Sequence, residues 1–422
     1  MLIDGREPKK WEKLFEQFDF MAQLAAESQM ENAELDRAIL VALASDDVAT
    51  RRVAAKLADR ESLKAAMPQL VAALDDRDRI VVTRMLDSLA SHHTAATLPH
   101  QIRMLEHADA IVRVAAADSI RDTLNVADLV VGTETVGSML NAVPTLMPAL
   151  DARLSDREST VRAAAALALA ETGVYVDGLA KLVDEHDSRT RRAAARALVK
   201  CGARPSLLGR VIRDRETRGT AISAFGVGFD SPRPSVELIP ALVEALGDRD
   251  DHVVSNALHC LGSLGETAAA AVEPIATLLS RKRVASTALG ALANIGASAA
   301  RVLPAVGKAL LDPAICFDAA RALGAIGAPA LPFAINALRV RDRTVRRASL
   351  HVVARQLGDP AALDAVCALL ADVNARVRYD TVIGLFDATV AARPAKAVLV
   401  RLAAEDPDHE VRNAARFTHE QL

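Results

Sequence analysis

The stretch Ser155-Asp-Arg-Glu-Ser-Thr-Val-Arg-Ala-Ala-Ala-Ala-Leu-Ala-Leu169 recurs in looser copies along most of the chain. The segments Asp187-Ser-Arg-Thr-Arg-Arg-Ala-Ala-Ala-Arg-Ala-Leu198 and Asp342-Arg-Thr-Val-Arg-Arg-Ala-Ser-Leu350 keep the same order of turn aspartate, arginine and small apolar residues. A unit that returns roughly every 30 residues predicts a stacked solenoid, because each unit buries its apolar face only against its neighbours.

The copies align on one anchor position near the start of the second helix of each predicted hairpin. The anchor falls at Arg52, Val82, Arg113, Arg162, Arg191, Arg218, Val254, Ala285, Cys316, Arg346, Arg378 and Arg412. An apolar residue follows most anchors after two helical turns, so both residues lie on one helix face. The alignment predicts an all-α, right-handed α-solenoid of about twelve helical hairpins.

The first helix of each hairpin carries a proline near its start, as in Met67-Pro-Gln-Leu70 and Ile239-Pro-Ala-Leu242. Proline is tolerated there because the first-turn N–H groups have no partner within the helix. Hairpins often end in Leu-Gly or Ile-Gly, and glycine is the usual left-handed stop of a helix.

This pattern resembles HEAT repeats, in the short form of about 30 residues first associated with phycobilisome lyases, over roughly residues 36–420. The resemblance implies a ladder in which a turn aspartate and a helix-start arginine hydrogen-bond across adjacent units. Aspartate suits a helix N-terminus, and arginine offers a charge-assisted fork. The expected ladder residues are Asp156, Arg162, Asp187, Arg191, Arg218, Asp342, Arg346, Asp372, Arg378 and Arg412.

Composition agrees with helices and offers little chemistry. The 422 residues are 51% hydrophobic but only 3% aromatic, which disfavours β-sheets. The four cysteines are far apart in sequence, and no nucleotide-binding or catalytic motif occurs, so we predict no metal, no cofactor and no catalytic residue. No long apolar run is present, and we expect a cytoplasmic protein without a membrane partner.

Departures from the repeat are the best functional clues. We predict an N-terminal capping region over residues 1–35 and a solenoid over 36–422, with an insert at about 123–142 that lengthens one repeat step. Residues 189–218 hold ten basic and two acidic residues, in a chain whose net charge is −3. The anchor arginine is absent at Val254, Ala285 and Cys316, where we expect weaker crosslinking and easier bending.

We predict a non-enzymatic scaffold or adaptor that binds a protein partner, possibly through an acidic segment, on its extended concave surface. The candidate contacts are Arg189, Arg192, Arg196 and Lys200 in the basic band, and Leu129, Val130 and Val131 in the insert. Two alternatives remain open. One is a nucleic-acid-binding protein, similar to the HEAT-like DNA glycosylases, that uses residues 189–218. The other is a lyase or maturation accessory factor.

Overall fold

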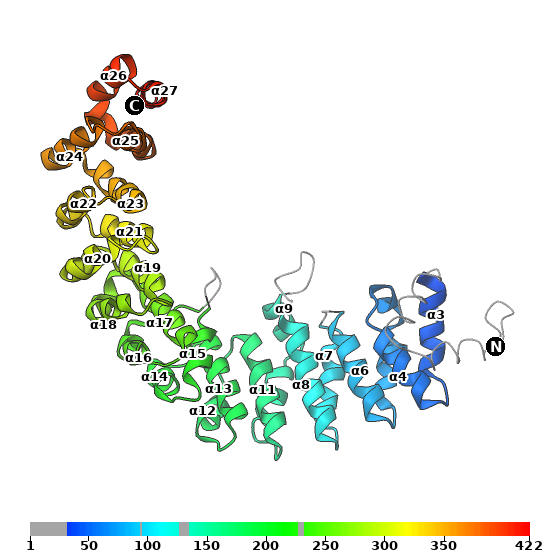
Figure 1. Ribbon diagram of the computed structural model, residues 1–422. Coiled ribbons are helices and arrows are strands. Elements are labelled where there is room, and N and C mark those ends of the chain that lie inside the picture. Colours follow the sequence, from blue (N-terminus) through cyan, green and yellow to red (C-terminus); the bar gives the residue numbers. More distant parts are fainter. Residues whose placement is uncertain (1–31, 93–94, 126–134, 227–231) are drawn as a thin grey trace. The chain divides into compact units, whose positions relative to one another are not determined.

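The computed structural model describes residues 32–92, 95–125, 135–226 and 232–422. Every regular element within these ranges is a helix (Figure 1). The chain divides into two compact units, Met1–Val211 and Ile212–Leu422. In each unit, helical hairpins follow one another along the chain. The prediction of an all-α solenoid is confirmed.

In the described part of the first unit there are five hairpins. Their first and second helices are α3 (Asn32–Leu43) and α4 (Val48–Leu57), α5 (Met67–Ala72) and α6 (Arg79–Ala90), α7 (Leu98–Met104) and α8 (Ala110–Asn125), α10 (Leu146–Arg153) and α11 (Ser159–Thr172), and α12 (Asp177–Lys181) and α13 (Ser188–Lys200). Short 3-10 turns extend some first helices, at η1 (Glu61–Ala66), η2 (Ala73–Asp75) and η3 (Leu182–Asp184). The division between the units falls within α14 (Pro205–Arg213), and α15 (Arg218–Ala224) follows it.

The second unit continues the same order of helices. Its hairpins pair α16 (Ile239–Ala245) with α17 (Asp251–Ser263), α18 (Val272–Thr277) with α19 (Ala285–Ile295), α20 (Leu303–Leu310) with α21 (Cys316–Ile326), α22 (Leu331–Ala337) with α23 (Arg343–Val353), α24 (Pro360–Leu370) with α25 (Ala375–Ala388), and α26 (Lys396–Glu405) with α27 (His409–Glu420). Its 3-10 turns are η4 (Val236–Leu238), η5 (Gly265–Ala271), η6 (Leu278–Ser280), η7 (Gly296–Val302), η8 (Ala328–Ala330), η9 (Ala354–Gln356) and η10 (Thr389–Ala395).

Within each unit, every second helix packs directly on the second helix of the next hairpin. In the first unit α4 contacts α6, α6 contacts α8, α8 contacts α11, and α11 contacts α13. Small residues allow this close approach. A Cβ added at Gly384 of α25 would lie 2.3 Å from the Leu350 side chain of α23. Leucine, valine and alanine side chains fill the seams between hairpins.

The predicted insert contains an additional helix. The α8 helix continues to Asn125, and α9 (Val136–Ala142) contacts α11 and buries Met139 completely. The predicted contacts Leu129, Val130 and Val131 lie outside the described residues. So does the aromatic part of the predicted capping region, because residues 1–31 are not described.

One described stretch, Ala285–Leu310, is long and apolar enough in composition to cross a membrane. It is not one continuous helix. The α19 helix ends at Ile295, and Gly296 takes a φ of 72°, a left-handed conformation that stops a helix. Half of the stretch is buried within the protein. It therefore consists of two helices from consecutive hairpins.

Candidate functional site

An arginine links the turns of consecutive hairpins at five places, and Arg378 of α25 shows the arrangement best. Its Nη1 donates to the backbone carbonyl oxygens of Asp372 at 2.8 Å and Val373 at 3.3 Å, in the turn of its own hairpin. Its Nε and Nη2 donate to the two carboxylate oxygens of Asp406 in the next turn, both at 2.7 Å. The Arg378 and Asp406 side chains are 8% and 2% exposed. One guanidinium therefore closes its own turn and links it to the next hairpin.

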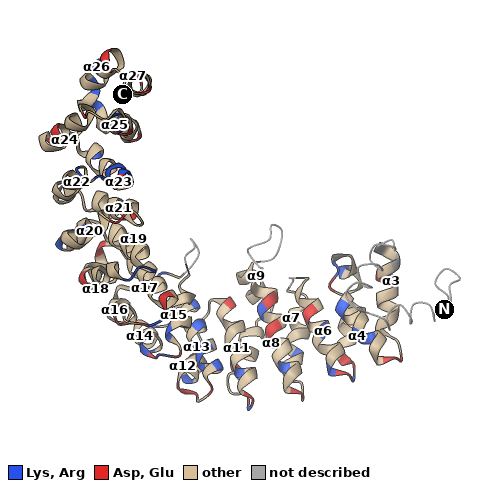
Figure 2. Ribbon diagram, viewed as in Figure 1, with Lys and Arg blue, Asp and Glu red and all other residues tan. Residues whose placement is uncertain are grey.

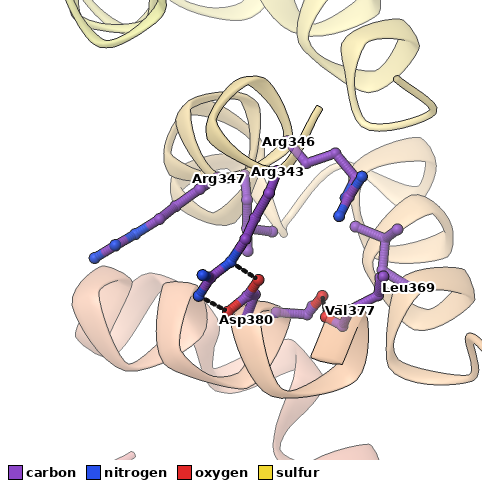
Figure 3. Close-up of a pocket in the computed structure, with 8 residues that line it drawn as sticks. Arg343, Arg346, Arg347, Leu369, Val377 and Asp380 are labelled. Carbon is purple, nitrogen blue, oxygen red and sulfur yellow. Dashed lines mark hydrogen bonds and ion pairs between the residues drawn. The ribbon is translucent and has the colours of Figure 1, made fainter. Parts of the chain in front are cut away.

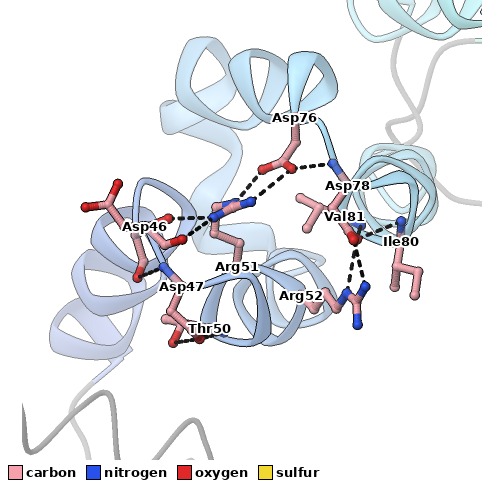
Figure 4. Close-up of polar contacts among 10 residues, drawn as sticks. Asp46, Asp47, Thr50, Arg51, Arg52, Asp76, Asp78, Ile80 and Val81 are labelled. Atoms are coloured by element: carbon pink, nitrogen blue, oxygen red, sulfur yellow. Dashed lines mark hydrogen bonds and ion pairs between the residues drawn. The ribbon is translucent and has the colours of Figure 1, made fainter.

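The same link, which we call a rung, recurs at four other places. The other rungs are Arg51 to Asp76, Arg113 to Asp156, Arg162 to Glu185, and Arg218 to Asp248, at 2.6 to 2.8 Å. Figure 4 shows Arg51 between the turn of its own hairpin and Asp76.

These contacts correct two details of the sequence alignment. The first anchor is Arg51 and not Arg52, because Arg52 instead pairs with the helix-capping residue Asp78 at 2.6 Å. The acid that receives Arg162 is Glu185 and not Asp187. In this rung only Nη2 of Arg162 binds the carboxylate of Glu185. The buried Nε of Arg162 has no hydrogen-bond acceptor among the described residues. In the rungs of Arg51, Arg113 and Arg378, Nε binds the carboxylate.

The turn aspartates have two structural roles: some accept a rung arginine, and others cap the helix that follows the turn. The receiving acid Asp406 also accepts the N–H of Asp408, and Asp408 caps α27. Hydrogen bonds from Arg378 hold the pKa of Asp406 below its ordinary value. Asp187 and Asp342 are instead helix caps, so they do not receive a rung arginine.

Several expected ladder residues make only part of a rung. Arg346 and Arg412 each bind the two carbonyl oxygens of their own turn, without an acid within 4 Å among the described residues. The carboxylate of Asp372 accepts the N–H of Asn374, and no arginine among the described residues donates to that carboxylate. Arg191 is not one of these residues; in its own turn it binds the carbonyl oxygens of Glu185 at 2.6 Å and His186 at 2.9 Å.

The three consecutive anchors that lack arginine, Val254, Ala285 and Cys316, are not equivalent. Arg281 of the next hairpin replaces the arginine missing at Val254. It donates to the carbonyl oxygens of Asp248 and Arg249, six and five residues before Val254, and forms an ion pair with Asp251 at 2.5 Å. The expected loss of crosslinking therefore does not occur at this position, whereas easier bending around Ala285 and Cys316 stays a prediction.

The predicted basic residues of α13 form one stripe, because Arg189, Arg192, Arg196 and Lys200 follow each other at steps of three or four residues. Lys200 binds Glu171 at 2.6 Å, and Arg196 lies 3.9 Å from the same carboxylate. Arg189 and Arg192 are exposed, and neither has an acidic partner within 4 Å in the described structure. The positive charge is therefore unbalanced at the N-terminal half of α13.

An acidic patch, Asp87, Asp118, Asp122 and Glu171, lies on the neighbouring second helices α6, α8 and α11 (Figure 2). Burial, and then repulsion from Asp122 and Asp118, raises the pKa of Asp87. Burial likewise raises the pKa of Asp118, although Arg121 lies 2.6 Å away. The sequence held the signal for this patch, since Asp87 and Asp118 each stand five residues after an anchor.

A second group of arginines, Arg343, Arg346 and Arg347 of α23, does not form a ligand pocket. Arg343 pairs with Asp380 at 2.6 Å, whereas Arg346 and Arg347 point in different directions (Figure 3). The cavity beside them has a volume of about 10 Å³, which is room for one water molecule at most. These arginines therefore do not converge on a common ligand.

A larger hollow of about 300 Å³ lies beside the rung of Arg162. Its charged groups are largely neutralised by rung partners, since Arg162 binds Glu185 and Asp156 receives Arg113. Among the described residues, no three His, Cys, Asp or Glu side chains gather where they could hold a metal ion.

Comparisons with known proteins agree with this geometry. A family model described as HEAT repeats matches residues 204–279. No curated protein sequence matches the chain. Kap121p aligns over 98% of this chain and 52% of its own, with 14% identity and a TM-score of 0.52.

Kap95p gives a similar result, from a structure that describes how its binding changes the switch loops of RanGDP. It aligns over 95% of this chain and 64% of its own, with 12% identity and a TM-score of 0.53. The chain thus spans less than two thirds of either protein, and identities this low report the fold alone. The family model thus identifies HEAT repeats at residues 204–279, and the same helical hairpin recurs along the rest of the described chain.

Proposed function

We propose that this protein is an interaction scaffold and that an acidic segment of a partner protein lies along the α13 basic stripe. One observation carries the proposal: Arg189 and Arg192 are exposed on one side of α13 and have no acidic partner among the described residues. Guanidinium groups left unpaired at a surface bind carboxylates through charge-assisted, often bidentate, hydrogen bonds.

The fold supports a protein partner in general. Repeat solenoids offer long surfaces built from the same helix of each unit, and such surfaces suit extended protein ligands. Kap95p, which shares this fold, is described as binding RanGDP. We transfer from this likeness only the class of partner, a protein.

The acidic patch on α6, α8 and α11 favours a short acidic segment over a long polyanion. From Arg189 to Lys200 the stripe is about 17 Å long, at roughly 1.5 Å per helical residue. About five extended residues of a peptide match this length. A nucleic acid that continued from α13 toward α8 would bring phosphates beside Asp118 and Asp122, two carboxylates that share the single cation of Arg121 and therefore repel phosphates.

The proposal is tested by reversing the two unpaired charges in the variant R189E/R192E. The matched control is R393E/R401E, because Arg393 and Arg401 are exposed, lie on the first-helix side of the last hairpin and have no ion pair within 4 Å in the part of the chain that the structure describes. Both double variants change the net charge by the same amount. Circular dichroism first establishes that all three proteins keep their helix content.

Each tagged protein is then used to capture partners from nuclease-treated lysate of its native cell, with quantitative mass spectrometry as the readout. We expect proteins that the wild type and the control retain and that R189E/R192E loses. Equal recovery by all three proteins would refute the role of the stripe. Binding of a labelled oligonucleotide that R189E/R192E abolishes, with no protein lost in the capture experiment, would instead assign the stripe to nucleic acid, with a steep salt dependence.

A further inference from the structure

The outer face of the last hairpin departs from a rule that all earlier second helices obey. The rule concerns the position four residues after each anchor, one helical turn further along. At this position stand Ala55, Leu86, Ala117, Ala166, Ala195, Ile222, Leu258, Leu289, Ala320, Leu350 and Val382, and none is more than 5% exposed. In α27 the equivalent residue is Arg416, and it is exposed.

This position is apolar elsewhere because it packs against the next hairpin. Leu350 shows the contact, since it lies against Gly384 of the following second helix. An arginine at this position is unsuited to such a seam, because burying an unpaired charge costs several kcal/mol. The outer face of α27 therefore carries a charge at a position where the other second helices are apolar.

The same face carries an arginine that is already held in place. Arg412 donates from Nη1 to the carbonyl oxygens of Asp406 at 2.6 Å and Pro407 at 3.1 Å, as Arg378 does in its own turn. Arg378 uses its remaining edge for the carboxylate of Asp406. The matching edge of Arg412, Nε and Nη2, has no partner among the described residues. Arg412 thus presents one half of a rung.

Arg416 and Arg412 are one helical turn apart, so both guanidinium groups belong to the same face. Phe417, which follows Arg416, is 57% exposed, and its ring lies 5.4 Å from that of Phe386 on α25. Phe417 therefore lies toward the preceding hairpin and not on this face, and the two cations match a ligand that carries carboxylates.

We propose that the outer face of α27 is a docking surface for an acidic turn of a partner protein, whose carboxylate completes the rung at Arg412 and contacts Arg416. The partner supplies at this point what Asp406 supplies to Arg378. This surface is separate from the α13 stripe, so either can fail without the other.

A second copy of this chain does not offer the required group. The receiving acid of a rung stands six residues before the anchor of its own hairpin, as Asp76 and Asp406 do. In the first hairpin that position is Ser45, whose hydroxyl accepts the N–H of Asp47. Head-to-tail stacking of two copies would therefore place Arg412 opposite a serine.

The chain itself provides the probe for a test. A fluorescent peptide that copies residues 402–411 contains the Asp406 turn that Arg378 binds, and a second peptide carries Asp406→Asn. Fluorescence polarisation measures the binding of both peptides to the intact protein. The variants are Arg416→Glu, which leaves the carbonyl contacts of Arg412 in place, and Arg412→Lys, which keeps the charge but loses the fork. R393E/R401E again serves as the control.

We expect the wild type and the control to bind the unmodified peptide. Arg416→Glu, Arg412→Lys and the asparagine peptide should each weaken binding roughly tenfold, the usual effect of losing a charged hydrogen bond. Binding that is unchanged in Arg416→Glu would overturn the proposal. So would tighter competition by an oligonucleotide than by the peptide, or self-association of the protein that Arg416→Glu abolishes. R189E/R192E should leave this binding intact, which separates this test from that of the α13 stripe.

Discussion

The rung between Arg378 and Asp406 allows a sharp test of what holds consecutive hairpins together. Asp406→Ala removes a carboxylate that is 2% exposed and leaves the guanidinium of Arg378, 8% exposed, without its partner. Removing one member of a buried ion pair costs about 3–5 kcal/mol, because the remaining charge keeps its desolvation penalty. The backbone carbonyl that binds Arg412 is unchanged by the substitution.

Asp372→Ala is the matched control, since Asp372 occupies the same turn position one hairpin earlier. Its side chain accepts only the N–H of Asn374, at 2.8 Å, and receives no arginine. Loss of one such hydrogen bond costs about 0.5–1.5 kcal/mol. The two variants should therefore differ by about 2 kcal/mol or more, with Asp406→Ala the less stable.

Hydrogen exchange is the suitable assay, because a repeat protein opens locally and a single global unfolding energy describes it poorly. Amides of α25 and α27 should exchange about thirtyfold faster in Asp406→Ala than in Asp372→Ala, which corresponds to about 2 kcal/mol. Equal exchange in the two variants would refute the view that the rung, and not the turn, supplies the stability.

The same comparison has a defined pH dependence. Hydrogen bonds from Arg378 hold the pKa of Asp406 below its ordinary value, so the folded state binds this proton less readily than the unfolded chain does. The stabilisation by the rung is therefore complete above the unfolded pKa of about 3.9 and declines as the pH falls through the lower, folded pKa. The difference between wild type and Asp406→Ala should be constant near neutral pH and shrink below about pH 4. A difference that persists unchanged into that acidic range would contradict the assignment.

Two further substitutions test packing and crosslinking. Gly384→Ala should lower the free energy of unfolding by about 1–3 kcal/mol in urea, because its Cβ would lie 2.3 Å from a buried side chain. A Cβ added at Gly324 would have no atom within 4 Å, so Gly324→Ala should raise the free energy of unfolding by about 0.5–1 kcal/mol. A change of the same sign in both variants would contradict this reasoning. Arg281→Ala should accelerate hydrogen exchange in the turn before α17, whereas Arg283→Ala, with an 86% exposed side chain, should not. Equal protection in both would mean that Arg281 does not replace the missing anchor.

The repeat period was sufficient to predict the helices but not the identity of each anchor. Arg51 and Arg52 are adjacent arginines, and the alignment chose the second of them. The structure distinguishes them by their contacts, because only Arg51 binds both the carbonyl oxygens of its own turn and the carboxylate of Asp76. Neighbouring residues on a helix differ by about 100° in direction, so a shift of one residue changes the partner completely.

Contacts between hairpins were the hardest feature to predict. Arg281 supplies the carbonyl contacts missing at Val254, yet it stands at a different position of the repeat. The acidic patch was missed for another reason. Asp87 and Asp118 are separated by one repeat in sequence and become neighbours only because α6 packs on α8. Column-by-column comparison of the repeats would have found them.

An anchor arginine is often matched by an acidic residue in the turn of the next hairpin, and an anchor without arginine by a residue that is not acidic. Arg378 and Arg113 are each followed by a receiving aspartate, whereas Val82 is followed by His107 at that position and Cys316 by Val340. A buried guanidinium and a buried carboxylate are each costly alone, so the pair is favourable only when both are present. Five rungs therefore pair an anchor arginine with the acid of the next turn, whereas Arg189 and Arg192 of α13 and Arg412 of α27 have no acid within 4 Å among the described residues.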